Sequence, residues 1–303
     1  MNGFIVIDKP AGITSHDVVS RVRRILSTRK VGHTGTLDPF ATGVLPVAVN
    51  DGTKAIPFLD EGSKAYDAVL RLGVATDTLD MTGSVLQETD CAAVTRERFV
   101  EALSAFLGDI SQVPPMYSAL KRNGQPLYKL ARQGVEVERE ARRVTISSLE
   151  LVSFEPPLVG VRVVCTRGTY VRTLADDIGR SLGCGAALQE LRRTASGPFD
   201  LRRSVTLDAL ESAVKDGLAD KLFVSPFVAL SHLADIPLTP GGLEKIRHGR
   251  SPDWTDTCSA APFGNGGELV RLSVDGELAA VAALAGENGD SPRIVLKRVF
   301  IAS

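Results

Sequence analysis

Runs of apolar residues and regularly spaced apolar positions divide the chain into predicted strands and helices. Residues 3–8 are almost continuously apolar, which predicts a buried strand. After Ser15 the apolar positions recur at helical spacing, so we predict a helix that Ser15 caps. These positions are Val18, Val19, Val22, Ile25 and Leu26. The chain therefore begins with a strand followed by a helix.

The same patterns predict a mixture of strands and helices over the rest of the first 220 residues. Further strands are expected at residues 44–49, 66–72, 144–154 and 158–166, the last two joined as a hairpin by Glu155-Pro156-Pro157. Further helices are expected from Thr95 to a stop at Gly108, from about Tyr170 to a stop at Gly183, and after Thr206. The two kinds of element do not alternate regularly. This order favours an α+β fold, with a mostly antiparallel sheet flanked by helices, over a doubly wound fold.

The end of the chain has a different pattern. Near Ile236-Pro237-Leu238-Thr239-Pro240 the sequence becomes more acidic, and short strands follow at 269–274, 277–283 and 293–300 between glycine-rich turns. At 303 residues, two domains are expected rather than one. We predict a larger domain over residues 1–232 and a small β-rich domain over 233–303, joined by a proline-marked linker.

Composition indicates an ordinary globular protein of the cytoplasm. Hydrophobic residues make up 44% of the chain and charged residues 23%. The apolar run at residues 4–7 is too short for a signal peptide, and no apolar stretch reaches membrane-spanning length. The four cysteines are far apart and form no CxxC pair, which disfavours a zinc site and indicates free thiols in a reducing compartment.

Charge is nearly balanced overall but unevenly distributed. The formal net charge is −1, while the first 203 residues hold 26 basic and 23 acidic residues. Basic residues gather in groups at Arg21, Arg23, Arg24, Arg29 and Lys30, at Lys121, Arg122, Lys129 and Arg132, and at Arg192, Arg193, Arg202 and Arg203. A track for nucleic-acid phosphates needs local groups of this kind, although solvated surface charge explains each group equally well.

Residues 113–143 form a second unusual segment, in which aromatic and aliphatic residues lie among lysines and arginines. Tyr117 and Tyr128 are its tyrosines. Such a mixture suits stacking on unpaired bases while phosphates are held. A surface insertion whose apolar residues pack locally has the same composition, so this segment alone does not decide between the two.

Residues 32–43 form a loop rich in glycine and threonine around one carboxylate, Asp38, which Pro39 follows. Such a loop lets the backbone approach another molecule closely and is typical of an active site. Taken alone, Asp38 equally fits a loop aspartate that caps a turn. The chain lacks a phosphate-binding loop, a G-x-S-x-G elbow and an H-E-x-x-H motif. Asp77 and Asp80 lack a third nearby ligand, so we interpret them as turn residues and not as a metal site.

The loop resembles the motif by which the TruB family of tRNA pseudouridine synthases is known, and further segments extend the resemblance over nearly the whole chain. These are Asp8-Lys9-Pro10-Ala11-Gly12, Lys64-Ala65-Tyr66 with Arg71-Leu72-Gly73, Arg167-Gly168-Thr169-Tyr170-Val171-Arg172-Thr173-Leu174, and Leu191-Arg192-Arg193-Thr194. The resemblance implies the pseudouridine synthase fold. It also implies that residues 113–143 are a thumb-like insertion that grips the T-loop, and that residues 233–303 are a PUA-like RNA-binding domain.

The resemblance further implies a role for each candidate residue. Asp38 is implied to be the catalytic aspartate, and Tyr66 to stack on the target base. Arg172 is implied to pair with the Asp38 carboxylate. Tyr170 and Leu191 are implied to line the uridine pocket. His33 is implied to meet the RNA where the uridine has left its stack; without the family, it equally fits a loop histidine bonded to its own backbone.

The activity implied is isomerisation of uridine to pseudouridine in tRNA, at uridine 55 of the T-loop. We expect Arg172 to lower the pKa of Asp38, which would then act as an anion. No metal, nucleotide or redox cofactor is implied, and we expect a monomer that needs no protein partner. Two alternatives remain: a guide-RNA-dependent relative, although the guided relatives lack the thumb-like insertion, and a non-catalytic RNA chaperone using the same surface.

Overall fold

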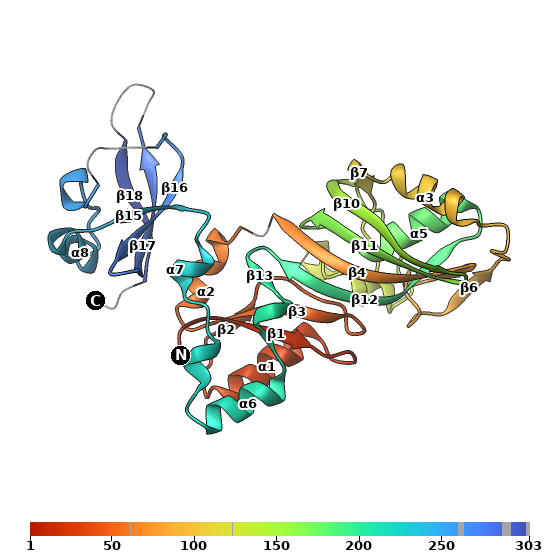
Figure 1. Ribbon diagram of the computed structural model, residues 1–303, viewed down its shortest axis with the longest axis horizontal. Coiled ribbons are helices and arrows are strands. Elements are labelled where there is room, and N and C mark those ends of the chain that lie inside the picture. The colour runs from red at the N-terminus through yellow and green to blue at the C-terminus, as the bar shows by residue number, and fades with distance from the viewer. Residues whose placement is uncertain (61, 123, 260–263, 287–291, 301–303) are drawn as a thin grey trace.

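The chain forms one large sheet with helices on one face and a second, smaller sheet at one end of the molecule (Figure 1). The computed structural model describes residues 1–60, 62–122, 124–259, 264–286 and 292–300. In spatial order the path of the large sheet is β14 (Ser204–Val205), β1 (Gly3–Lys9), β3 (Thr42–Val49), β12 (Ala186–Ser196), β4 (Ser63–Leu72), β11 (Leu158–Thr166), β10 (Arg142–Glu155) and β7 (Gly108–Gln112). In addition, β2 (Val31–His33) pairs with β3, and β13 (Phe199–Asp200) pairs with β12.

Most neighbouring strands of the large sheet run antiparallel. The exceptions in its path are β1 with β14 and β3 with β12, which are parallel. The α+β class predicted from the sequence is therefore confirmed. The hairpin of β10 and β11 is also confirmed, with Glu155 paired to Leu158 across its turn.

Helices cover one face of the large sheet and close its main core. They are α1 (Ser15–Ile25), α3 (Arg96–Ser104), α5 (Val171–Leu182) and α6 (Leu207–Lys215). Side chains from all four helices pack in one buried cluster with the strands. The predicted cap of α1 is wrong: Thr14 is the N-cap and forms a capping box with Asp17, while the Ser15 hydroxyl bonds elsewhere.

The other face of the large sheet is covered only in part. Around β1 and β3 it packs against the C-terminal sheet in a second buried cluster, which joins Phe4 and Val6 to Leu278 and Val281. Around β4 and β11 the second face is partly exposed, because Asp67 and Val69 lie on the opposite side of the strand from Tyr66 and Leu70. The C-terminal part is thus fixed to the larger part by a shared core.

The C-terminal sheet consists of β15 (Ala234–Pro237), β16 (Leu269–Val274), β17 (Glu277–Ala285) and β18 (Arg293–Val299), with α8 (Pro240–Arg247) packed beside it. Its last three strands match the predicted ones. The proline-marked linker is wrong, because Ile236 lies fully buried within β15 and pairs with Leu272. Pro237 fits there because β15 is an edge strand, and Pro240 is the first residue of α8.

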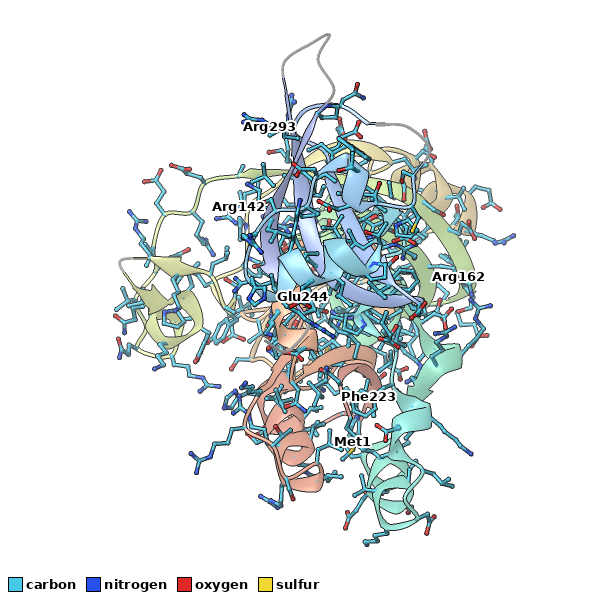
Figure 2. All side chains as sticks on the ribbon, turned by 90° about the vertical axis from the view of Figure 1, so that its left-hand side faces the viewer. Met1, Arg142, Arg162, Phe223, Glu244 and Arg293 are labelled. Atoms are coloured by element: carbon cyan, nitrogen blue, oxygen red, sulfur yellow. The ribbon has the colours of Figure 1, made fainter. Side chains whose placement is uncertain are left out.

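The segment 113–143 projects from the rest of the protein as short elements (Figure 2). They are β8 (Lys121–Arg122), β9 (Gln125–Pro126) and α4 (Leu127–Ala131). Leu127 is buried, while Val113 and Val135 are largely exposed. Among the helices in the described parts of the chain, none is long and apolar enough to cross a membrane.

Candidate active site

Asp38 lies in the loop between β2 and β3, and three buried polar side chains hold the backbone of that loop. The Ser15 hydroxyl accepts a hydrogen bond from the Leu37 amide at 2.8 Å and donates to the Leu37 carbonyl at 3.0 Å. Lys9 donates to the carbonyls of Pro39 at 3.1 Å and Ala41 at 2.7 Å. Backbone atoms on both sides of Asp38 are therefore fixed before any substrate binds.

Arg193 is the third of these side chains and is fully buried. It donates to the carbonyls of Gly35 at 3.1 Å, Thr36 at 3.4 Å and Val44 at 2.7 Å. Part of the loop also packs in the core, since Leu37 is 4% exposed. The loop is thus rigidly supported and not merely open to an approaching molecule.

The Asp38 carboxylate forms a two-point ion pair with Arg172 at the start of α5. Arg172 Nε lies 2.9 Å from Asp38 Oδ2, and its Nη2 donates to Oδ1 at 3.2 Å. The pairing implied by the family resemblance is therefore present. Arg172 is 5% exposed at its side chain and Asp38 33%, so the arginine is enclosed while the carboxylate remains reachable.

Arg172 also binds a second carboxylate, which the sequence analysis did not assign to the site. Its Nη1 lies 3.3 Å from Asp80 Oδ2. The other Asp80 oxygen accepts from the Thr82 amide and from the hydroxyls of Thr78 and Thr82. The turn predicted for this segment is confirmed, but Asp80 in addition holds Arg172 from the side opposite Asp38.

The electrostatics of Asp38 differ from the expectation. Burial raises the pKa of Asp38 above its ordinary value; the Arg172 cation opposes this rise, and the Asp80 charge adds to it. The expected effect of Arg172 is therefore present, but the net shift is upward because desolvation outweighs the ion pair. Burial likewise lowers the pKa of Lys9 to about 8, against the opposing charge of Asp38.

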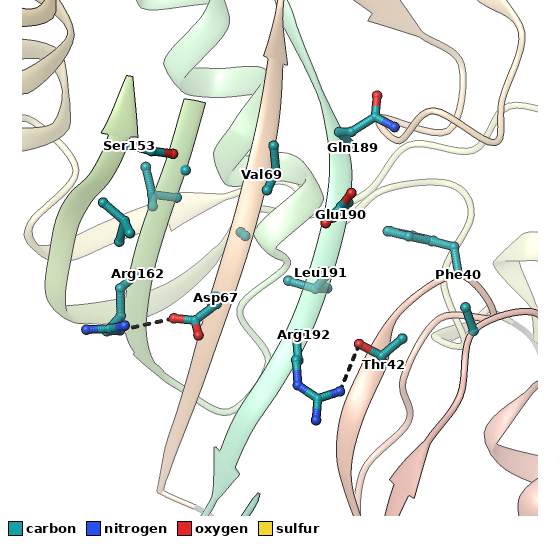
Figure 3. Close-up of a pocket in the computed structure, with 15 residues that line it drawn as sticks. Phe40, Thr42, Asp67, Val69, Ser153, Arg162, Gln189, Glu190, Leu191 and Arg192 are labelled. Carbon is teal, nitrogen blue, oxygen red and sulfur yellow. Dashed lines mark hydrogen bonds and ion pairs between the residues drawn. The ribbon is translucent and has the colours of Figure 1, made fainter. Parts of the chain in front are cut away.

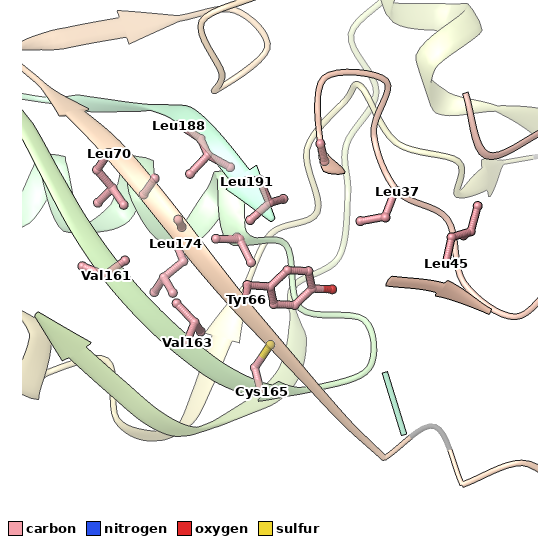
Figure 4. Close-up of a cluster of buried hydrophobic side chains, with 14 of the residues drawn as sticks. Leu37, Leu45, Tyr66, Leu70, Val161, Val163, Cys165, Leu174, Leu188 and Leu191 are labelled. Atoms are coloured by element: carbon pink, nitrogen blue, oxygen red, sulfur yellow. The ribbon is translucent and has the colours of Figure 1, made fainter. Parts of the chain in front are cut away.

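A cavity of about 300 Å³ lies beside Asp38 and contains most of the candidate residues. Tyr66, Tyr170, Arg172 and Leu191 all line it. Tyr66 extends from β4 toward the loop that carries Leu37, with Leu191 close by on β12 (Figure 4). The cavity therefore combines an aromatic face and an aliphatic wall with one reachable carboxylate.

Tyr170 is placed by residues that the sequence analysis did not identify. The Gln112 side chain, 2% exposed, accepts from the Tyr170 amide at 3.0 Å and donates to its carbonyl at 3.3 Å. The Tyr117 carbonyl accepts from Arg172 Nη2 at 2.8 Å. The beginning of the segment 113–143 thus contacts the arginine that holds Asp38.

His33 lies at the end of β2 and does not line the cavity. Its Nδ1 is buried and has no hydrogen-bond partner among the residues that the structure describes. Burial lowers the pKa of His33, and the nearby cations Arg193 and Lys64 lower it further. The ring is therefore neutral at pH 7 and flanked by positive charge.

A larger hollow of about 600 Å³ lies on the opposite face of the sheet (Figure 3). Arg162 and Asp67 form an ion pair across it, and Arg192 reaches Thr42. Asp38, Tyr66 and Arg172 do not line this hollow. We therefore place the site at the smaller cavity. Over the described parts of the chain, no group of three or more His, Cys, Asp or Glu side chains is arranged to hold a metal ion.

Comparison with known proteins gives one consistent result. Residues 23–171 match the model for the N-terminal domain of TruB family pseudouridylate synthases, and residues 172–230 match a tRNA pseudouridylate synthase B C-terminal domain. The chain is 55% identical to tRNA pseudouridine synthase B of Geotalea uraniireducens, covering 99% of this chain and 98% of that protein. It is 54% identical to the protein of the same name from Geobacter sulfurreducens, covering 99% and 100%.

Solved structures agree with this result. The chain is similar to one in the crystal structure of a Cbf5–Nop10–Gar1 complex, with a TM-score of 0.77 and 28% identity over 99% of this chain and 85% of that one. A structure of an H/ACA RNP bound to a substrate RNA containing 2′-deoxyuridine gives a TM-score of 0.76 at 26% identity, with coverage of 99% and 85%. The chain belongs to the TruB family of pseudouridylate synthases.

Proposed function

We propose that this protein isomerises uridine to pseudouridine in tRNA, at uridine 55 of the T-loop, with Asp38 as the catalytic residue. The observation that carries the proposal is the Asp38 carboxylate, fixed by Arg172 at two points beside the cavity of Tyr66 and Leu191. Relatives that are 55% and 54% identical to this chain are named tRNA pseudouridine synthase B, which supports the formation of pseudouridine in tRNA.

The reaction is an isomerisation, so one carboxylate suffices. The N1–C1′ bond of uridine breaks, the base turns, and a C5–C1′ bond forms while a proton moves from C5 to N1. Hydrolytic glycosidases use a second carboxylate either to activate water or to attack the sugar. Here the detached uracil stays bound and water is unwanted. Asp38, held in its ion pair with Arg172, acts in its ionised form as a nucleophile at C1′ or at C6 of the base, or as a base that removes a ribose proton.

The cavity suits one extruded nucleotide. Its volume of about 300 Å³ is at the lower end for ligand pockets. A uridine inside folded RNA must leave its stack to enter such a cavity, and the Tyr66 ring offers a flat surface for the extruded base. His33 lies outside the cavity, where it would meet the RNA around the extruded nucleotide.

Two outer parts of the protein would supply RNA affinity. We assign residues 113–143 as a thumb-like insertion that grips the T-loop, supported by its projection and by exposed Lys121 and Arg122. We assign residues 233–303 as a PUA-like RNA-binding domain beside a catalytic domain of residues 1–232, supported by the separate four-stranded sheet. Free cysteines among the described residues are consistent with a cytoplasmic protein.

A guide-RNA-dependent activity is the second candidate, because the similar solved structures include H/ACA particles. The full-length relatives named tRNA pseudouridine synthase B favour the unguided reaction. The intact set of Asp38, Tyr66 and Arg172 disfavours a purely non-catalytic RNA chaperone.

The test is incubation of the purified protein alone with an unmodified tRNA transcript, followed by mapping of pseudouridine. We expect conversion of uridine 55 without any added RNA or protein, and none in a transcript that carries cytidine there. Conversion only after addition of a guide RNA and partner proteins would overturn the proposal in favour of the guided reaction.

A further inference from the structure

Arg193 combines complete burial with the absence of an acidic partner. It is 0% exposed, and among the described residues no carboxylate forms an ion pair with it. Its neighbour Arg192 differs, because it lies 41% exposed and pairs with Asp8 at 2.7 Å on the other side of the strand. Burying an unpaired guanidinium is costly unless other groups replace its water. The groups that do so indicate its role.

The first group consists of carbonyls on both sides of Asp38. Gly35 and Thr36 precede the aspartate, and Val44 follows it. A planar guanidinium donates in fixed directions, so these bonds fix the two ends of the loop relative to one another. The backbone after the loop also passes close to β12, because a Cβ on Gly43 would lie 2.2 Å from the Arg193 carbonyl oxygen.

The second group is the Tyr66 side chain. Arg193 and Tyr66 are directly opposite each other where β12 pairs with β4, so both side chains lie on the cavity face. Burial raises the pKa of Tyr66, while the nearby Arg193 cation counteracts this rise. The Lys9 ammonium, in contrast, donates to backbone carbonyls, those of Pro10, Pro39 and Ala41.

We infer that Arg193 is a positioning residue that sets the distance between the Asp38 carboxylate and a base stacked on Tyr66. It does so because one rigid group binds the loop of the carboxylate and lies directly opposite the tyrosine on the paired strand. This inference rests on the proposed function of the cavity. It goes beyond that function by assigning Arg193 a part in turnover that requires no contact with RNA.

The main test replaces Arg193 by lysine, which keeps the charge but cannot donate to three carbonyls in the fixed directions of a planar guanidinium. We expect the single-turnover rate constant at saturating tRNA to fall by about 10- to 100-fold, as for a misplacement of about 1 Å, with affinity for the tRNA unchanged within about twofold. Arg192→Lys is the matched control and should retain its rate. Equal rates for wild type and Arg193→Lys, or equal losses in both variants, would overturn the inference.

A double-mutant cycle separates positioning from mere folding support. In a Tyr66→Phe background the effect of Arg193→Lys should shrink, because the hydroxyl on which the Arg193 charge acts is already absent. Strictly multiplicative effects would contradict this coupling between Arg193 and Tyr66.

A further measurement requires neither activity nor a folded Arg193 variant. Tyr66→Phe should speed amide hydrogen exchange in the peptide that covers residues 34–37 several-fold, because the guanidinium that binds the Gly35 and Thr36 carbonyls loses the polar group opposite it. Unchanged exchange there would overturn the inference even if the enzyme is active. Faster exchange in a protein that proves inactive on tRNA would instead support the positioning role of Arg193 and count against the proposed function alone.

Discussion

Asp80→Asn tests whether the second carboxylate at Arg172 matters. Asp80 is 3% exposed, and the substitution places an amide where an ion pair of 3.3 Å now exists. Removing one partner of a fully buried ion pair costs about 3–5 kcal/mol. In this variant Arg172 still contacts Asp38 and the carbonyls of Thr78 and Tyr117. We therefore expect the free energy of unfolding to fall by about 1.5–3 kcal/mol, the range for one hydrogen bond to a charged group.

The same substitution should also change activity in two ways. Arg172 loses a fixed point, so we expect the single-turnover rate constant at saturating tRNA to fall by about 10- to 100-fold. The Asp80 charge raises the pKa of Asp38, so its removal lowers that pKa. Because the reaction requires ionised Asp38, the acid limb of the pH–rate profile should move to lower pH.

The assay combines urea unfolding with single-turnover rates over a range of pH. Asp77→Asn is the matched control, because Asp77 lies in the same turn and bonds to Ser84 and Tyr117 but not to Arg172. An Asp80 variant with wild-type stability and rate, or an acid limb moved to higher pH, would refute the reasoning.

Three further predictions follow from the structure. Asp38→Asn should be at least as stable as wild type near pH 7, because burial raises the pKa of Asp38 and its ionised form therefore destabilises the fold. This difference in stability should vanish as the pH falls through the raised pKa toward the unfolded value of about 3.9. Urea unfolding at several pH values would measure it. Replacing the basic group Lys121, Arg122, Lys129 and Arg132 by alanine should weaken tRNA binding and reduce its dependence on salt, and an unchanged salt slope in filter binding would contradict the role given to the thumb-like insertion. Leu278→Ala should lower the free energy of unfolding by about 2–3 kcal/mol, because Leu278 packs in one core with Phe4. During unfolding of this variant, the loss of activity should coincide with the fluorescence change of Trp254, the single tryptophan. Two separate transitions would contradict the shared core.

The sequence predicted the helices and strands whose ends and apolar spacing are marked by nearby residues. The helices at Thr95, Tyr170 and Thr206 begin where expected, because each start has its own capping or spacing signal. Strand β12 was not predicted, since register shifts beside Gln189 and Thr194 interrupt its alternation. The family resemblance, and not periodicity, pointed to Leu191 on that strand.

The site shows the same division. Asp38 and Arg172 could be named from motifs, but Asp80 could not, because its ion pair joins residues 92 positions apart. The Ser15 hydroxyl looked like a helix cap, yet it bonds to Leu37, 22 positions away. The direction of the Asp38 pKa shift was missed for a similar reason, because the sequence does not reveal how deeply the fold buries a loop residue. Contacts of this kind exist only once the sheet has brought distant segments together.

The most direct test of the central claim is single-turnover conversion of uridine 55 by Asp38→Asn, with tRNA binding measured in parallel. The amide keeps the shape of the side chain but is neither a useful nucleophile nor a base at neutral pH. We expect binding within a few-fold of wild type, because affinity comes from contacts spread over the RNA surface, and a rate reduced by about 10³-fold or more at saturating RNA. Conversion near the wild-type rate would contradict the assignment of Asp38 as the catalytic residue.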